Sequence, residues 1–280
     1  MRIGLAGGSG FIGRHLRAAL SARRNDVITA SLRKPVEAAA AFATCDAVVN
    51  LAGESIFQRW SHAAKQRIYQ SRVEGTRALI DAFAGHARRP AIYIGASATG
   101  YYPPSETATY TEASPHGDDF LGDLCARWEA EAQRATQLGM RVAILRTGVV
   151  LGTDGGALAT MVRPFRLGLG GVIGSGRQWI SWVHIDDIVG IYRMALDGAS
   201  GTFNATAPQP VDNAELTRAL ASVLHRPALF RVPAVALRVA LGEGASILLD
   251  GQRVLPQHAL ESGYNFRFTA LDDALGNLLT

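Results

Sequence analysis

The chain has 280 residues, of which 48% are hydrophobic and 19% are charged, and its formal net charge is +4. These values are typical of a compact globular protein, and no apolar run reaches the roughly 18 residues that a membrane-spanning helix needs. The basic residues are scattered, are mostly arginine and do not alternate with aromatic residues, so the charge does not favour a nucleic-acid partner.

The cysteines and histidines indicate neither a disulfide framework nor a metal site. Cys45 and Cys125 are the only cysteines, both lie in apolar, helix-like segments, and we expect buried free thiols. The histidines lack paired metal-ligand spacing, so no metal is expected. Because a strand begins at residue 2, we expect no cleavable signal before the fold and predict a cytoplasmic protein with no membrane partner.

The first residues of the chain read as a strand, a glycine turn and a helix. An apolar strand is predicted over 2–6, and apolar residues recur at helical spacing over 11–23. Of the glycines between them, Gly7 permits a tight turn, Gly10 lets the backbone approach a pyrophosphate, and Gly13 lets the helix pack on the strand. We expect the phosphates on free N–H groups at the start of the helix. The predicted cofactor ligands here are Gly7, Gly10, Phe11, Ile12 and Gly13.

Basic residues follow the second predicted strand, 26–31, where the adenosine end of a dinucleotide is expected. A carboxylate there would bind the ribose 2′-hydroxyl of NAD, but the chain has Ser31, Arg33 and Lys34. A 2′-phosphate carries close to two negative charges, and an arginine can bind it with two hydrogen bonds. The sequence therefore predicts NADP(H). The alternative is a solvated pair of cations at a helix start, which Pro35 also fits.

The third predicted strand, 46–51, ends in small residues. Only one helix, 35–43, fits between it and the second strand, so we expect the usual third strand to be missing from the sheet edge. The residues expected to line the cofactor after this strand are Leu51, Ala52, Gly53 and Glu54. Three interpretations of Glu54 stay open: contact with the cofactor ribose, proton donation, and capping of the next segment.

A serine ends the fourth predicted strand, 91–96, at the edge where open α/β sheets bind ligands. The Ser97 hydroxyl is a candidate to bind a substrate oxygen, and the alternative is that it only ends the strand. Tyr101 and Tyr102 follow, and each is either a neutral proton donor or a packing residue. The segment Ser97-Ala-Thr-Gly-Tyr101 resembles the serine motif of UDP-galactose epimerase and other extended short-chain dehydrogenases.

The helix predicted over 117–138 lacks the Tyr-x-x-x-Lys pair that this superfamily normally uses. When Glu129 is aligned with the usual downstream glutamate, Leu121 stands at the tyrosine position and Cys125 at the lysine position. A tyrosine of ordinary pKa, about 10, is ionised only about one part in a thousand at pH 7, a deficit of roughly 4 kcal/mol. The usual acid–base chemistry of the superfamily is therefore in question for this chain.

Two arginines are candidates for binding an anionic substrate. Arg146 ends the strand predicted over 141–147, where it either holds the strand end or binds an anion. Arg177 precedes the segment Ser181-Trp-Val-His-Ile-Asp-Asp187, and this order resembles a run near the substrate in extended-type epimerases. We interpret His184 as a structural residue, and the two aspartates suit the start of the next helix.

The alternation of strands and helices predicts an α/β fold with a Rossmann-like, doubly wound parallel sheet. Residues 1–150 form the predicted NADP(H)-binding domain and 151–280 a smaller C-terminal substrate lobe, with 186–206 folding back onto the first domain. The other predicted elements are helices over 58–85, 156–167, 186–198, 213–224 and 233–241 and a strand over 202–205, followed by an irregular tail.

Several segments occur together in an order that resembles one family. They are Gly7 to Arg14, Asn50 to Ser55, Gln70 to Thr76, Ser97 to Tyr102, Phe120-Leu121 with Trp128-Glu129, Ser181 to Asp187, Gly201 to Pro208 and Leu249 to Pro256. The chain is similar to the atypical extended short-chain dehydrogenase/reductases, a sugar-nucleotide epimerase-like family whose C-terminal segment of unassigned function resembles residues 230–280. The resemblance implies a Rossmann-like fold and NADP(H) binding, but no settled reaction.

We therefore expect an NADP(H)-dependent oxidoreductase or epimerase that acts on a small polar substrate, with nucleotide-linked substrates included. Its predicted catalytic residues are Ser97, Tyr101 and Tyr102, and its predicted substrate-binding residues are Arg146 and Arg177. The missing tyrosine and lysine favour one alternative, a non-catalytic NADP(H)-binding redox sensor or regulatory protein.

Overall fold

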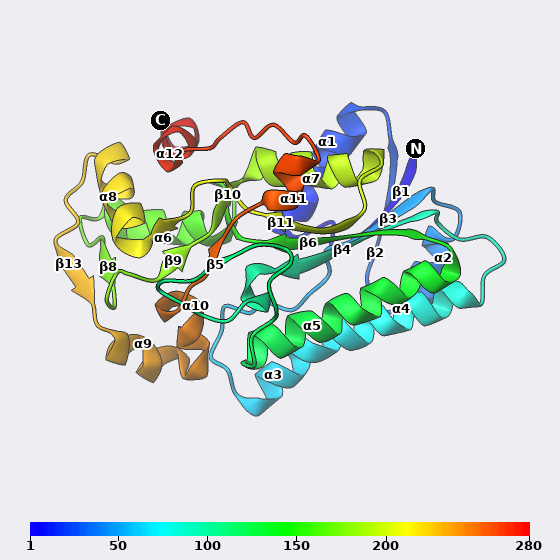
Figure 1. Ribbon diagram of the computed structural model, residues 1–280, viewed down its shortest axis with the longest axis horizontal. Coiled ribbons are helices and arrows are strands. Elements are labelled where there is room, and N and C mark those ends of the chain that lie inside the picture. Colours follow the sequence, from blue (N-terminus) through cyan, green and yellow to red (C-terminus); the bar gives the residue numbers. More distant parts are fainter.

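The computed structural model describes residues 1–280, and a six-stranded parallel sheet forms its centre (Figure 1). The strand order is β11-β6-β4-β3-β1-β2, and every neighbouring pair is parallel. The strands are β1 (Arg2–Ala6), β2 (Asp26–Ala30), β3 (Ala47–Asn50), β4 (Ile92–Ala98), β6 (Arg141–Thr147) and β11 (Gly201–Ala205). The predicted α/β fold is confirmed, and β2 is an edge strand with no further strand beyond it.

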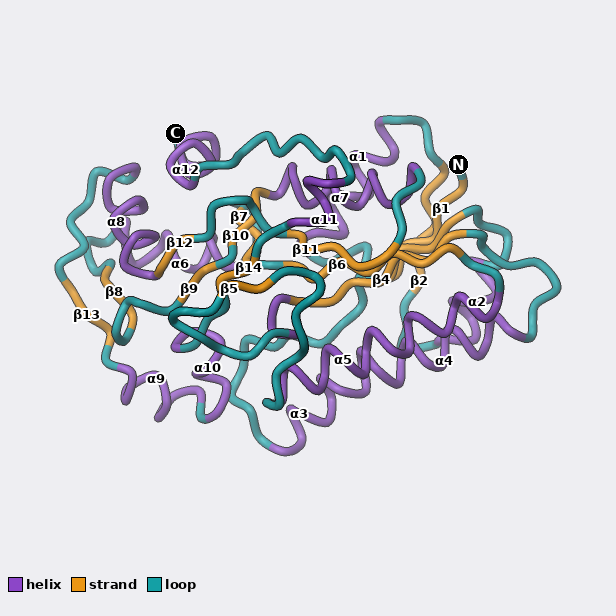
Figure 2. Tube along the Cα trace, in the orientation of Figure 1, coloured by secondary structure: helices purple, strands orange, loops and turns teal.

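Helices cover both faces of the sheet, because its strands carry apolar side chains on both sides (Figure 2). One face carries α1 (Phe11–Ala22) and α7 (Ile185–Asp197), and the other carries α2 (Pro35–Phe42), α4 (Gly75–Ala84) and α5 (Phe120–Gln133). Leu16 of α1 and Ile188 of α7 are buried on the first face, and Phe42 and Phe83 on the second. Two separate apolar layers therefore hold the sheet.

The helix predicted over 58–85 begins later than expected and contains a π-helical turn. It comprises α3 (His62–Tyr69), the π turn η1 (Gln70–Glu74) and α4, in unbroken succession. The start is set by Ser61, whose Oγ accepts a hydrogen bond from the Ala64 N–H at 3.2 Å. A π turn shifts the helical register at one place, and such turns are frequent at functional sites.

The segment 149–241 contains short strand pairs and helices, and a separate apolar cluster lies among them. Its paired strands are β7 (Val149–Leu151) with β10 (Trp182–His184), β8 (Gly171–Ile173) with β13 (Phe230–Val232), and β9 (Trp179–Ile180) with β12 (Val211–Asp212). Its helices are α6 (Gly156–Arg166), α8 (Asn213–Val223) and α9 (Ala234–Leu241). Between these elements α7 and β11 return to the central sheet, where β11 pairs with β6.

The prediction that the chain after residue 241 is an irregular tail is wrong. The structure has η4 (Glu243–Ala245), α10 (Ser246–Leu249), β14 (Arg253–Val254), α11 (Gln257–Glu261) and α12 (Leu271–Leu279), with β14 paired to β5 (Thr109–Tyr110). Leu271 and Leu275 of α12 pack in the cluster that contains Leu216 and Leu220 of α8. The first four of these elements have two to five residues, which is too few to show a periodic pattern. Helix α12 has nine residues with Leu271, Ala274 and Leu275 buried on one side, and sequence reasoning missed this pattern.

Strand β4 extends past the end of β3, and the last residues of β4 and β6 place polar side chains next to each other. Ser97 of β4 lies opposite Arg146 of β6 in the ladder, although 48 residues separate them along the chain. The next pair is Ala98 with Thr147, and the 3₁₀ turn η2 (Thr99–Tyr101) follows at once. The sheet therefore brings three sequence-predicted residues, Ser97, Tyr101 and Arg146, to one edge.

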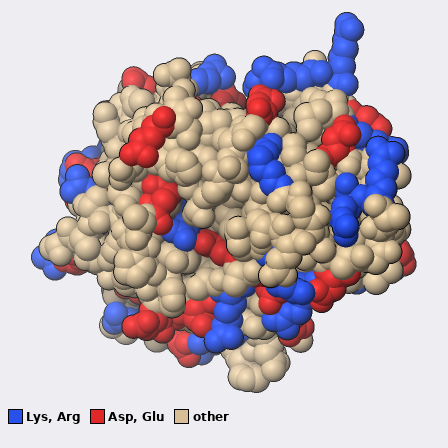
Figure 3. All heavy atoms as spheres, turned by 45° about the vertical axis from the view of Figure 1, so that its right-hand side comes forward, with Lys and Arg blue, Asp and Glu red and all other residues tan.

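The surface carries charges of both signs. Lys and Arg side chains lie among Asp and Glu side chains over the face shown in Figure 3. None of the helices has the length and apolar character needed to cross a bilayer. Both cysteines are free and buried, which confirms the expected thiols.

The tight contact of α1 with the glycine turn gives the first prediction. A Cβ at Gly13 would lie 2.3 Å from the Gly7 carbonyl oxygen, whereas a Cβ at Gly276, inside α12, would meet no atom within 4 Å. We expect Gly13→Ala to lower the free energy of unfolding by about 1–3 kcal/mol, as overpacking does, and Gly276→Ala to raise it by about 0.5–1 kcal/mol. Urea denaturation of both variants measures this, and equal effects would contradict the packing described.

Candidate cofactor and substrate site

The glycine turn after β1 forms a cradle of backbone that no side chain fills. Gly7 has φ +77°, and Cβ atoms at Gly10 and Gly13 would lie 3.2 and 2.3 Å from the Gly7 oxygen. Helix α1 begins here without a side-chain cap, so the N–H groups of its first turn have no partner in the protein. Free N–H groups and the positive end of the helix dipole suit a diphosphate, and the residues present fit one.

A cavity of about 870 Å³ lies on the β2 side of this turn. It is lined by Gly7, Ser31, Arg33, Ala52, Gly53 and Glu54, all predicted cofactor residues, and by Arg17 and Arg67. Three guanidinium groups on one cavity favour a ligand with several negative charges. Lys34 does not line it, because its ammonium pairs with Glu37 at 2.9 Å across the exposed start of α2. We call this the adenosine-side cavity.

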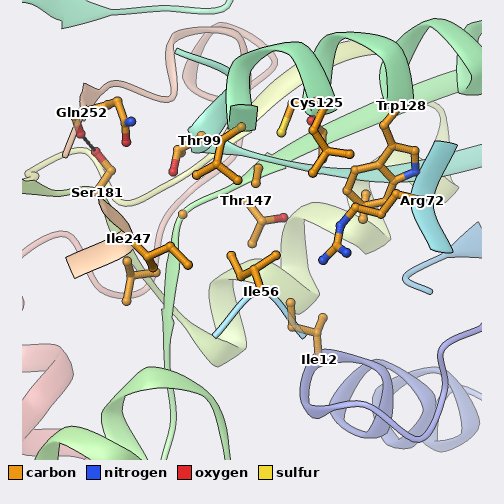
Figure 4. Close-up of a pocket in the computed structure, with 18 of the residues that line it drawn as sticks. Ile12, Ile56, Arg72, Thr99, Cys125, Trp128, Thr147, Ser181, Ile247 and Gln252 are labelled. Carbon is orange, nitrogen blue, oxygen red and sulfur yellow. Dashed lines mark hydrogen bonds between the residues drawn. The ribbon is translucent and has the colours of Figure 1, made fainter. Parts of the chain in front are cut away.

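A second cavity, of about 420 Å³, shares Gly7 with the first and opens at the carboxyl ends of the strands. Two groups of predicted residues line it. One group lies at the start of α1 and comprises Gly10, Phe11, Ile12 and Gly13. The other lies at the carboxyl ends of strands and comprises Leu51 and Ser97. Figure 4 shows other lining side chains, among them Arg72, Cys125, Trp128 and Thr147. Ile247 and Gln252 from the C-terminal segment form part of its wall (Figure 4). We call this the substrate-side cavity.

Ser97 is the only predicted catalytic residue that lines the substrate-side cavity. Its hydroxyl is buried, at 3% exposure, and its Oγ lies 2.5 Å from Glu129 Oε1, to which it donates a hydrogen bond. Glu129 lies on α5 and is itself held by Arg146 through two hydrogen bonds of 2.9 and 2.8 Å. Because the Ser97 proton points to the carboxylate, the lone pairs of Oγ are the part left for a ligand.

Arg146, a predicted substrate-binding residue, lines neither cavity. Its side chain is 5% exposed and forms an ion pair with Glu129 at 2.8 Å. Although burial lowers the pKa of the Arg146 guanidinium, the hydrogen bonds and the charge of Glu129 outweigh this and raise it. Arg146 is thus a buried structural cation that holds the strand end, which was the alternative interpretation from the sequence.

Neither predicted tyrosine lines the substrate-side cavity. Tyr102 is fully buried, donates to Asn204 Oδ1 at 2.7 Å and accepts from Arg146 Nη1 at 2.8 Å. Burial raises the pKa of Tyr102 to about 12. The ring of Tyr101 packs on the guanidinium of Arg146, with 3.4 Å between Cζ and the ring centre. Aromatic packing, the alternative interpretation, describes both side chains.

Two other predicted residues lie away from the substrate-side cavity. Arg177 is 73% exposed and pairs with Glu106 at 3.1 Å, so it does not line the cavity. The Glu54 side chain lies on the adenosine-side cavity, where its carboxylate is 4.0 Å from Arg67. The Glu54 backbone is fixed instead: its N–H donates to Ser71 Oγ at 2.9 Å and its carbonyl accepts from Arg72 at 2.8 Å.

The positions of the missing tyrosine and lysine open onto the substrate-side cavity. Leu121 and Cys125, one turn apart on α5, both line it together with Ser97. Burial raises the pKa of the Cys125 thiol to about 12, so this side chain is neutral at physiological pH. The cavity therefore lacks both the phenol and the ammonium at the place where the superfamily carries them.

Sequence reasoning missed Arg17, Arg72 and Trp128. Arg72 falls inside the segment Gln70 to Thr76 that carried the family resemblance, but an arginine in a predicted helix gives no sign of facing a cavity. Arg72 lies on the π turn, and that turn has no sequence signature. Trp128 stands one residue before Glu129, and its indole N–H donates to Thr76 Oγ1 at 3.0 Å.

The glycine cradle, the parallel sheet and the cavities at its carboxyl edge define a Rossmann-like dinucleotide-binding protein of the extended short-chain dehydrogenase type. Residues 3–205 match the family described as the NAD dependent epimerase/dehydratase family. Residues 232–278 match a domain of unknown function, DUF1731. The chain belongs to the NAD-dependent epimerase/dehydratase family, and the resemblance predicted from its motifs is confirmed.

The relatives are similar over almost the whole chain. The human epimerase family protein SDR39U1 is 40% identical over 294 residues, which span all of both chains. A chloroplastic SDR39U1 homolog of Arabidopsis thaliana is 41% identical, over 98% of this chain and 86% of its own. The crystal structure of human SDR39U1 (isoform 2) with NADPH superposes with a TM-score of 0.91 at 37% identity, over 100% of this chain and 99% of that one.

The buried pair of Glu129 and Arg146 gives the second prediction. Removing one partner leaves the other charge buried and unpaired, so we expect Glu129→Ala to lower the free energy of unfolding by about 3–5 kcal/mol. Asp123→Ala removes an exposed ion pair with Arg127 on the same helix, and its effect should stay below about 1 kcal/mol. Chemical denaturation measures both, and a loss from Glu129→Ala no larger than the control's would contradict the buried network.

Proposed function

We propose that the chain is an NADP(H)-dependent oxidoreductase or epimerase that acts on a small substrate bearing a hydroxyl or carbonyl group. One observation carries the proposal: the adenosine-side cavity, with its arginines, joins the substrate-side cavity at Gly7, and the second cavity contains Ser97. The human relative crystallised with NADPH supports the choice of cofactor. A cytoplasmic location and a nucleotide-linked substrate stay predictions.

The residues that would hold the cofactor line the two cavities, from the adenosine end to the nicotinamide end. Arg33 and Ser31 would bind the 2′-phosphate, and the N–H groups of Phe11 and Ile12 the diphosphate. Leu51 would pack against the nicotinamide half, which supplies hydride transfer when bound. The protein contributes position and electrostatics: Ala52 and Gly53 allow close approach, and the apolar side chains that line the substrate-side cavity would exclude water from the nicotinamide ring.

Ser97 would orient the reacting oxygen. Its hydroxyl proton is directed to Glu129 at 2.5 Å, so Oγ would accept a hydrogen bond from a substrate hydroxyl and fix its direction. Arg146 holds Glu129 in place, and the Glu129 carboxylate is the acceptor of the Ser97 hydroxyl. A proton leaving the substrate oxygen would pass to Ser97 as the Ser97 proton passes to Glu129, so no tyrosine or lysine is required at Leu121 and Cys125.

The third prediction tests the phosphate preference. We expect Arg33→Asp to weaken NADPH binding roughly 10- to 100-fold, because a charge-assisted hydrogen bond is replaced by repulsion, while NADH binding changes little. Arg23→Asp makes the same charge change on an exposed residue at the end of α1 and should leave both affinities near wild type. Fluorescence titration with the two nucleotides measures the ratio, and an unchanged preference would contradict the role of Arg33.

The fourth prediction tests the reacting end. Ser97→Ala should keep NADPH affinity and lower the turnover of any carbonyl or sugar-nucleotide substrate by about 100-fold, since the oxygen loses its positioning partner. Ser222→Ala, on an exposed face of α8, is the control. Spectrophotometric NADPH consumption measures the effect, and full activity in Ser97→Ala would remove Ser97 from the mechanism.

A second function is favoured by one observation. Leu121 and Cys125 stand in the substrate-side cavity where the superfamily has its tyrosine and lysine. This arrangement suits a non-catalytic NADP(H)-binding redox sensor, which needs binding and no proton transfer. Tight NADPH binding with no consumption across carbonyl and sugar-nucleotide panels would support the sensor, whereas consumption lost in Ser97→Ala would support the enzyme.

A further inference from the structure

Arg72 is a cation in the substrate-side cavity to which the proposed function gives no role. It lies on the π turn η1, and its guanidinium points into the cavity, near Ile56 and Trp128 (Figure 4). Other arginines in the continuous helix formed by α3, η1 and α4 have acidic partners: Arg67 lies 4.0 Å from Glu54, and Arg77 lies 2.6 Å from Glu131. Arg72 has no ion pair with any carboxylate, although it is less exposed than they are.

The Arg72 guanidinium is held in place from two sides. Its Nη1 donates to the Glu54 carbonyl at 2.8 Å, and its Cζ lies 5.3 Å from the centre of the Trp128 ring. Trp128 is fixed in turn, because its indole N–H donates to Thr76 Oγ1 at 3.0 Å. A guanidinium has five N–H donors, and only one of them has an acceptor here. A positioned fork with free donors is suited to binding an anion.

The loop after β3 leaves room for this side chain. A Cβ at Gly53 would lie 2.9 Å from Arg72 Cζ and about as close to both terminal nitrogens, at 3.0 and 3.1 Å. A larger residue at position 53 would therefore push the guanidinium aside. Gly53 lines the adenosine-side cavity and Arg72 lines the substrate-side cavity, so the guanidinium lies next to the junction between them.

The electrostatics of Arg72 call for a counter-charge. The lining of the same cavity includes Ile12, Ile56 and Leu124, which cannot solvate a cation. Burial lowers the pKa of the Arg72 guanidinium, so the protein holds this charge at a cost. A partly buried charge without a partner is unfavourable, and a bound anion would offset that cost.

We propose that Arg72 is an anion-binding residue at the junction of the two cavities, where its guanidinium binds phosphate or carboxylate oxygens of a ligand. Two ligands could supply these anionic oxygens: the cofactor through its diphosphate, and the substrate through an acidic group. With Cys125 at the lysine position, Arg72 brings a positive charge to this cavity from a different helix. The cofactor source rests on the proposed function, whereas the anion site itself does not.

The first arm of the test measures nucleotide affinity in Arg72→Gln, with Arg77→Gln as a control on the exposed face of the adjoining helix α4. If the anion is the cofactor diphosphate, NADPH binding weakens roughly 10- to 100-fold in Arg72→Gln. Binding of adenosine 2′-monophosphate, which has no diphosphate, stays at the wild-type value. Arg72→Lys keeps the charge without the fork and should fall between wild type and Arg72→Gln.

The second arm titrates inorganic phosphate and acetate into the NADPH-saturated protein by calorimetry. If the anion is an acidic substrate group, wild type and Arg77→Gln show one saturable site that Arg72→Gln lacks, while NADPH affinity is unchanged. If Arg72→Gln alters neither NADPH binding nor anion binding, the proposal is overturned. Should wild type bind no NADPH at all, the proposed function fails, and phosphate titration of the free protein still tests Arg72.

Discussion

The site depends on one steric constraint, the approach of helix α1 to the end of strand β1. A Cβ at Gly13 would lie 2.3 Å from the Gly7 carbonyl oxygen, so the contact exists only because both positions are glycine. This contact aims the uncapped end of α1 at the carboxyl edge of the sheet. The two cavities share Gly7 in their lining, so both lie against the same turn.

A buried hydrogen-bond network links Ser97 to the C-terminal segment. Ser97 donates to Glu129, Glu129 pairs with Arg146, Arg146 donates to Tyr102, and Tyr102 donates to Asn204. The Asn204 amide continues to the Leu255 carbonyl at 2.9 Å, inside the domain of unknown function. That domain also forms part of the cavity wall through Ile247 and Gln252. Its position and the orientation of Ser97 are therefore coupled through direct contacts.

The sequence predicted best those features that depend on local pattern. The glycine spacing, the strand–helix alternation and the short link 31–46 were sufficient for the sheet, the edge strand β2 and the cradle. The direction of a side chain could not be predicted from the sequence, because it depends on partners distant in the chain. Arg146 is buried against Glu129, and Tyr102 is buried against Asn204. Arg72 was missed because it lies on a π turn, which the sequence did not reveal. Elements of two to five residues after residue 241 were missed because they are too short to show a periodic pattern.

The central claim is that one nucleotide path runs from Arg33 across the glycine cradle to Ser97. A crystal structure of the protein with NADPH bound tests this claim most directly. It should show the 2′-phosphate within hydrogen-bond distance of Arg33, the diphosphate on the first turn of α1, and the nicotinamide ring in the cavity that Ser97 lines. A nucleotide bound elsewhere, or a nicotinamide ring directed away from Ser97, would contradict the account.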